Sequence, residues 1–482
     1  MYFNRILIFS FVLLLSVPQV SQAGRKCKKG VEVVILHTND MHSKIDNMAK
    51  LTWLADSLRQ QHRYLFLVSA GDNFTGNPIV DMYPEVGYPM VDLMNKAGFV
   101  LSAMGNHEFD MGQEQFSQRR KEAGFPFISG NIDVSGSHLR KIRPWVTLKA
   151  GKCRIPLVSF IQLEKNGIPS SHPSRLEGIK FTPADVKTAD FLFLKEKYGM
   201  LVGLTHLGIE GDVQLARKYP QFDLIIGGHS HTVMDKPLVE NGVTIVQAGS
   251  QLKSVGKTTL AIEAGKITGI DYELISLDAF EGRDLAVQAA IDHYNDNEEM
   301  NRVLASAVTP MTGKEELGAM MTDALTAMSG VDIAFQNIGG IRIPSLSAGD
   351  ILYRDIFRLD PFGNQVVVFE MTLPEIKSLI LNAYNRNKEA DLMVSGMTYT
   401  ALVDGDGSCV GVEMKGTDGQ PLDPAKIYKV GMNSYISASY TFDHADPGTV
   451  NYETTAQTLI SYLKKVQKVD YQGTRRTAVR SI

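Results

Sequence analysis

Short apolar runs that stop at polar loops dominate the first half of the chain. The run at 65–70 ends at Gly71-Asp72, and the runs at 31–37, 99–103, 200–204 and 223–226 end in the same way. Runs of this length predict buried strands, and the glycines that follow predict tight loops. Because open α/β sheets bind ligands at the carboxyl ends of their strands, the polar residues at these ends are candidate site residues.

Helical patterns alternate with these strands. One helix is predicted from the apolar face that starts at Met48 and ends at Leu58, and another over 90–97. Consecutive strands with glycine turns then continue to about residue 277, so a mixed sheet is expected. The predicted fold class is α/β.

Two domains are predicted. The first covers residues 31–278, and a polar segment with helical periodicity at 281–303 is interpreted as a linker helix. A second α/β unit, 305–482, contains a predicted helix over 317–328 and a predicted strand over 331–336. A chain of 482 residues is long enough for two hydrophobic cores.

The first 23 residues have the pattern of a signal peptide. Arg5 precedes the apolar run 6–17, and small residues offer a cleavage site after Ala23. We therefore predict a periplasmic or secreted protein without a stable membrane anchor. The three cysteines do not have metal-ligand spacing, and a bridge between Cys27 and Cys153 is an open alternative to unpaired thiols.

Composition restricts the partners. The formal net charge is −4 and 21% of residues are charged. The chain therefore has no excess of basic residues that would favour binding to a nucleic acid polymer. An anionic small molecule would have to be attracted locally, by metal ions or a few placed cations. The sequence predicts no oligomeric state.

Five strand ends carry metal-ligand chemistry. Asp40 and His42 follow the first strand and Asp72 the second, while histidines from three later loops complete the set. Carboxylate, amide and imidazole ligands suit first-row divalent metals such as Zn, Mn, Fe or Co, and the set contains no cysteine of a structural zinc site. Each motif alone is weak, but five in order predict a metal centre.

These motifs resemble the calcineurin-like metallophosphoesterases. The resemblance rests on Asn39-Asp40-x-His42, Gly71-Asp72-x-x-x-Gly76, Gly105-Asn106-His107-Glu108, Thr205-His206 and Gly228-His229-Ser230-His231. The second half resembles the C-terminal domain of bacterial 5′-nucleotidases through Asn337-x-Gly339-Gly340-Ile341-Arg342 and Pro361-Phe362-Gly363-Asn364. Together they imply the periplasmic 5′-nucleotidase, UDP-sugar hydrolase and 2′,3′-cyclic phosphodiesterase group, with a four-layer first domain of two packed mixed sheets flanked by helices.

The resemblance implies a site of two divalent ions bridged by Asp72. One ion would take Asp40, His42, Asp72 and His231, and the other Asp72, Asn106, His206 and His229. It further implies that hydroxide on the ions attacks phosphorus, assisted by His107, which Asp110 would orient. A helix cap is the alternative role for Asp110.

The resemblance also implies that the second domain binds the nucleoside. The matching residues are Asn337, Gly340, Arg342, Phe362 and, as a second aromatic, Tyr435, with Tyr440 or Phe442 as alternatives for that position. Two departures stand out: segment 312–318 lacks the usual arginine and asparagine, and the usual Gly-Gly-Asp-Gly loop is missing after Tyr435.

The implied function is release of phosphate from nucleoside 5′-monophosphates or related small nucleotides. UDP-sugar or 2′,3′-cyclic nucleotide hydrolysis, or a thiosulfohydrolase-like activity on the same scaffold, are alternatives. A non-catalytic nucleotide-binding protein is a third possibility, against which the complete ligand set argues.

Overall fold

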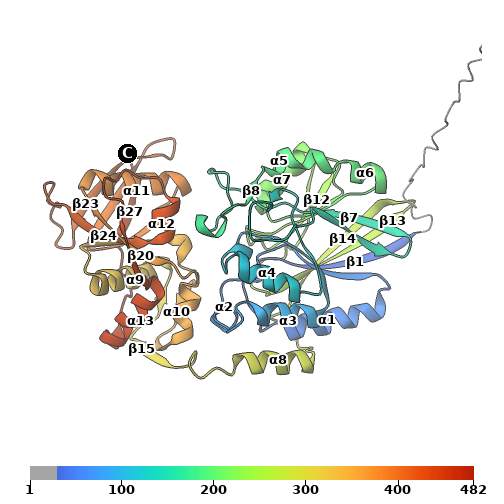
Figure 1. Cartoon of the computed structure of the whole chain (residues 1–482), viewed down its shortest axis with the longest axis horizontal. Helices are drawn as coiled ribbons and strands as arrows, with labels where there is room; N and C mark the ends of the chain where they lie inside the picture. The colour runs from blue at the N-terminus through green and yellow to red at the C-terminus, as the bar shows by residue number, and fades with distance from the viewer. Residues whose placement is uncertain (1–29) are drawn as a thin grey trace, which may run out of the picture.

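The computed structural model describes residues 30–482, which form two domains side by side (Figure 1). The predicted signal peptide and Cys27 lie outside the described residues. Cys409 is a buried free cysteine. Within residues 30–482, no helix combines the length and apolar character needed to cross a membrane.

Two six-stranded sheets form the centre of the first domain. The first has the order β14 (Lys266–Ser276), β13 (Ser254–Glu263), β1 (Val31–Thr38), β2 (Leu65–Ser69), β3 (Phe99–Ala103) and β4 (Phe127–Ile128). The second has the order β11 (Leu238–Glu240), β12 (Val243–Val246), β10 (Leu224–Ile226), β9 (Val202–Leu204), β7 (Cys153–Val158) and β6 (Trp145–Ala150). Both contain parallel and antiparallel pairs, so the predicted mixed sheets are confirmed.

Strand β1 shows why these runs are continuously apolar. Val33 and Ile35 face the core between the two sheets, whereas Val34 and Leu36 face the helices on the other side. Side chains alternate across a strand, and here both faces are buried. Burial on both faces therefore accounts for the unbroken hydrophobic run.

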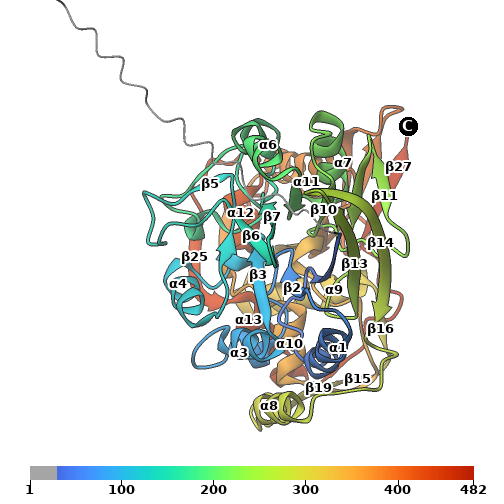
Figure 2. The same ribbon diagram turned by 90° about the vertical axis from the view of Figure 1, so that its right-hand side faces the viewer.

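Helices cover the outer face of each sheet, which gives the four layers implied by the resemblance. The covering helices are α1 (Met48–Gln61), α2 (Pro78–Asp81), α3 (Tyr88–Ala97), α4 (Gln113–Glu122), α5 (Ala184–Lys187), α6 (Phe193–Tyr198) and α7 (Gly208–Lys218). A short pair, β5 (Ile132–Asp133) and β8 (Lys180–Phe181), lies outside the two sheets. Figure 2 shows the first domain from its own side, with α1 and α3 below β2 and β3.

The linker segment differs from the expected helix over 281–303. Helix α8 spans only Leu285–Asn295, and Val303 already belongs to β15 (Val303–Ala307). The helix packs on the first domain, where Tyr294 donates a hydrogen bond to Asp92 at 2.9 Å and Val287 enters the core. Its apolar side therefore has a partner, and the connection between the domains is the short stretch 296–302.

The second domain is built on a five-stranded sheet with the order β21 (Leu392–Ser395), β17 (Ile333–Asn337), β24 (Tyr428–Asn433), β20 (Gln365–Met371) and β25 (Thr449–Thr454). Its helices are α9 (Lys314–Ser329), α10 (Tyr353–Leu359), α11 (Leu373–Asn387), α12 (Ser434–Ser439) and α13 (Thr455–Val466). Smaller sheets join β15 with β19 (Gly349–Leu352) and β26 (Lys468–Val469), β22 (Met397–Val403) with β23 (Cys409–Gly416) and β27 (Thr477–Ser481), and β16 (Met311–Thr312) with β18 (Ser345–Leu346).

Candidate metal centre

Loops from both sheets of the first domain meet at one place. Strands β1, β2 and β3 are parallel neighbours in the first sheet, and β9 and β10 are parallel neighbours in the second. Their carboxyl ends therefore lie at corresponding edges. The structure brings together all seven predicted ligands there: Asp40, His42, Asp72, Asn106, His206, His229 and His231.

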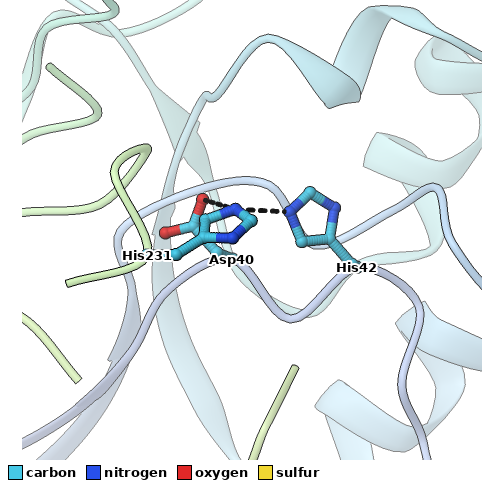
Figure 3. A group of neighbouring side chains, drawn as sticks. All are labelled: Asp40, His42 and His231. Atoms are coloured by element: carbon cyan, nitrogen blue, oxygen red, sulfur yellow. Dashed lines mark hydrogen bonds and ion pairs between the residues drawn. The ribbon is translucent and has the colours of Figure 1, made fainter. Parts of the chain in front are cut away.

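One group of side chains joins the first loop to the last. The Nε2 atoms of His42 and His231 are 3.0 Å apart, and His231 Nε2 lies 3.4 Å from Asp40 Oδ1 (Figure 3). His42 and Asp40 are buried, whereas His231 is partly exposed. The three ligand atoms are close enough to surround one ion.

A second group lies on the other side of Asp72. Its Oδ2 is 3.1 Å from His206 Nε2, and Asp72, His206 and His229 form a cluster that offers three ligand atoms. The Nδ1 of His229 is 3.1 Å from Asn106 Oδ1, which adds the amide to this group. Asp72 also belongs to a cluster with His42, so it stands between the two groups, where a bridging ligand would stand.

The histidine tautomers fit a cation. His42 Nδ1 donates to the carbonyl of Thr75 at 3.0 Å, and His206 Nδ1 donates to that of Ala70 at 2.8 Å. A neutral ring then carries its lone pair on Nε2. In His42 that atom faces His231 Nε2, and in His206 it is buried without a hydrogen-bond partner beside Asp72 among the described residues.

The electrostatics agree with that fit. Burial lowers the pKa of His206, but Asp72, Asp40 and the backbone of Ala70 together outweigh burial and raise this pKa to about 10. The local field therefore favours a positive charge at Nε2, which a proton or a metal ion can supply.

Backbone strain is concentrated in the same loops. Residues other than glycine rarely adopt a positive φ, which costs about 1–3 kcal/mol when the surrounding structure enforces it. Five of the seven predicted ligands adopt it: Asp40 (51°), His42 (48°), Asp72 (54°), His229 (80°) and His231 (56°).

Glu108 holds two of the loops together, a role that the motif alone did not reveal. Its buried carboxylate accepts hydrogen bonds from the backbone nitrogens of Asp72 (3.0 Å), Asn73 (2.9 Å) and Gly105 (2.6 Å). Burial, followed by the charge of Asp72, raises the pKa of Glu108 to about 7. A Cβ on Gly105 would lie 2.2 Å from Asp72 Oδ1, so only glycine allows this approach.

His107 and Asp110 form a close pair beside the metal centre. His107 Nδ1 is 2.5 Å from Asp110 Oδ2, and its Nε2 is 3.9 Å from Asp72 Oδ2. Burial lowers the pKa of His107, but Asp110 and then Asp72 outweigh it, so the net shift is upward. Asp110 does not cap α4, whose N-cap residue is Gly112, so the geometry favours the orienting role over the capping role.

A cavity of about 420 Å³ lies between the domains beside this centre. The first domain contributes His107 and Asp110 to its lining. All five predicted substrate-binding residues also line it: Asn337, Gly340, Arg342, Phe362 and Tyr435.

Phe362 occupies the junction of the two domains. Its ring stacks on His107 with ring centroids 5.9 Å apart and an interplanar angle of 23°. The guanidinium of Arg342 lies 5.5 Å from the centre of the same ring. An apolar face and a cation thus lie next to the catalytic candidate, as a site for an aromatic, anionic ligand requires.

Tyr435 lies on a helix, although the sequence suggested an altered loop at this position. Its ring packs edge-to-face on Tyr440 with centroids 6.2 Å apart, at the start of α12. The side chain of Asn433 caps that helix by accepting a hydrogen bond from Ile436 N at 2.9 Å, and its amide donates to Asn337 at 2.9 Å. The cap explains how a helix forms there without the usual glycine-rich loop.

The sequence interpretation missed several residues that line the cavity, among them Lys314, Arg386 and Asp391. Lys314 stands in the segment that lacks the usual arginine, so the cavity keeps a cation there; its Nζ donates to Ile338 O at 3.1 Å. Arg386 lies 4.8 Å from the ring centre of Tyr440, whose hydroxyl bonds to Asp391. The second carboxylate oxygen of Asp391 is buried and has no hydrogen-bond partner in the described part of the chain.

Comparison with known proteins gives two family matches. Residues 33–233 match the calcineurin-like phosphoesterase model and residues 297–442 match the 5′-nucleotidase C-terminal domain model. Protein UshA of Escherichia coli is 27% identical over 92% of each chain, and a 5′-nucleotidase of Vibrio cholerae is 29% identical over 72% of this chain and 75% of its own. The structure of a 5′-nucleotidase precursor from Thermus thermophilus superposes with a TM-score of 0.81 at 24% identity, covering 93% of this chain and 99% of its own.

Proposed function

The chain is a calcineurin-like phosphoesterase that carries a 5′-nucleotidase C-terminal domain, and on that premise we propose that it is an exported hydrolase of nucleoside 5′-monophosphates. The observation that carries this proposal is the cavity, which joins His107 and Asp110 of the first domain to Phe362 and Arg342 of the second. The relatives named as 5′-nucleotidases support the same substrate class.

The seven predicted ligands would hold two divalent ions, with Asp72 between them. When bound, such ions polarise a phosphoryl oxygen and lower the pKa of a coordinated water. The protein supplies strained loops that hold the donor atoms in place, and Glu108 fastens the loops of Asp72 and Gly105.

His107 would act on the phosphate directly. Asp110 holds its Nδ1, which leaves Nε2 free to donate a hydrogen bond to a phosphoryl or leaving-group oxygen. Phe362 covers the other side of the imidazole and limits the access of water.

The base would stack in the cavity of the second domain, between Phe362 and Tyr435 of α12. Stacking of a base on an aromatic ring contributes about 1–3 kcal/mol. We expect Phe362→Ala to raise KM for adenosine 5′-monophosphate by about 10- to 100-fold.

The same variant should leave KM for the small ester p-nitrophenyl phosphate within about twofold, since that substrate carries no nucleoside for the second domain to bind. Steady-state kinetics with both substrates measures the difference. Phe280→Ala, at an aromatic contact with Trp53 in the first domain, is the matched control. An equal rise of KM for both substrates would contradict the stacking role.

The activity itself is tested with purified protein. We expect phosphate release from nucleoside 5′-monophosphates with Mn²⁺ or Zn²⁺, its loss after dialysis against a chelator, and its return when metal is added back. UDP-glucose and 2′,3′-cyclic nucleotides test the alternative substrates. If the protein hydrolyses none of these phosphate esters in a metal-dependent reaction, the proposal is rejected.

A further inference from the structure

The loop 169–175 lies over the cavity and faces the second domain. Ser170, Ser171, His172 and Arg175 all line the cavity. The far end of the loop is fixed, because the side chain of Gln113 donates to the carbonyl of Arg175 at 3.1 Å.

Ser170 contacts both domains. Its carbonyl accepts a hydrogen bond from the side chain of Asn106, a proposed metal ligand, at 3.0 Å. Its hydroxyl lies 3.3 Å from the hydroxyl of Tyr435 on α12. One residue thus reaches the metal centre through its backbone and the second domain through its side chain.

Ser171 contacts the catalytic pair. Its hydroxyl donates a hydrogen bond to Asp110 Oδ1 at 3.3 Å. The other carboxylate oxygen, Asp110 Oδ2, is hydrogen-bonded to His107 Nδ1. Ser171 is 5% exposed, so bulk water does not readily replace this hydroxyl. Both oxygens of the carboxylate are therefore held, one by the imidazole and one by the loop.

The next residue, His172, adds a second contact to α12, through the backbone of Ser434. Three consecutive residues of the loop thus link α12 with Asn106 and Asp110. Because a planar peptide joins Ser170 to Ser171, displacement of one moves the other.

We propose that Ser170 and Ser171 form a positioning pair, which couples the docking of α12 to the orientation of Asp110 and, through it, of His107. This inference rests on the proposed function and extends it. When Tyr435 lies against Ser170, the hydroxyl of Ser171 holds Asp110 in line with the imidazole. Neither serine touches the reacting atoms, and each acts through a neighbour.

The first test is Ser171→Ala. We expect kcat to fall about 3- to 10-fold for both adenosine 5′-monophosphate and p-nitrophenyl phosphate, with KM unchanged, as the loss of one long hydrogen bond of ordinary strength predicts. Ser171→Thr keeps the hydroxyl and should restore most of kcat. Ser347→Ala removes an exposed hydroxyl that does not line the cavity and should behave as the parent protein.

The second test is a pair of double-mutant cycles. Ser171→Ala should have little further effect in an Asp110→Asn background, and its effect should be smaller than multiplicative when combined with Tyr435→Phe. Metal content and the unfolding midpoint should stay at the parent values in the serine variants. If the effects of the two substitutions on kcat multiply in both cycles, the residues act independently and the proposed coupling is wrong.

The outcomes separate the two proposals. If the parent protein hydrolyses no phosphate ester, the proposed function fails. If the parent protein is active and Ser171→Ala matches it in kcat, or if Ser171→Ala loses metal or folded structure, the positioning role fails while the proposed function stands.

Discussion

Replacement of Asp72 by asparagine is expected to remove at least one metal ion and to lower kcat by about three orders of magnitude or more. Its carboxylate belongs to the cluster with His42 and to the one with His206 and His229. An amide is neutral and a weak ligand, so the two ions would lose the negative charge that offsets their repulsion.

Elemental analysis after gel filtration measures this directly, together with phosphate release. Asp271→Asn, at an exposed position on β14, is the matched control and should keep both ions and full activity. Two ions retained by the Asp72 variant would contradict a bridging role. Circular dichroism separates metal loss from unfolding.

The second large effect is expected at His107. His107→Ala should keep the metal ions and lose about two to four decades of kcat, the usual contribution of a positioned acid–base group. The ring contacts Phe362 and Asp110 and also lies in one cluster with His42 and Asp72, but the seven ligands that the family resemblance implies do not include it.

Two substrates resolve what His107 contributes. p-Nitrophenolate leaves without a proton, so a role in protonating the leaving oxygen predicts a smaller loss with p-nitrophenyl phosphate than with a nucleotide. Equal losses would indicate stabilisation of phosphoryl charge instead. His293→Ala, an exposed position on α8, serves as the control. Full turnover in a metal-loaded His107 variant would exclude both roles.

The chain pattern predicted the part of this architecture that depends on local chemistry. Continuous apolar runs such as 33–36 indicated buried strands, and β1 is buried on both faces there. The carboxylate, amide and imidazole side chains that follow these strands indicated a metal centre before any contact between them was known. Helix α8 was predicted too long because charged and small residues continue the periodicity beyond the part that has a packing partner.

The second domain was less predictable at its cavity. Lys314, Arg386 and Asp391 come from separate segments in which no local pattern marks a site residue. Tyr435 is placed by a helix cap on Asn433, a contact that a missing glycine-rich motif does not reveal. Such positions depend on which side chains meet, and sequence spacing carries little information about that.

The sequence by itself determined the strand ends, the chemistry of the ligands and the likeness of each half to a known family, because these follow from hydrophobic periodicity and short motifs. The folded structure was needed to see that Glu108 holds two loops together, that α8 packs on the first domain, that Ser170 contacts Tyr435 of the second domain and that Ser171 contacts Asp110. These contacts join residues far apart in the chain, and close packing in three dimensions, rather than local pattern, selects them.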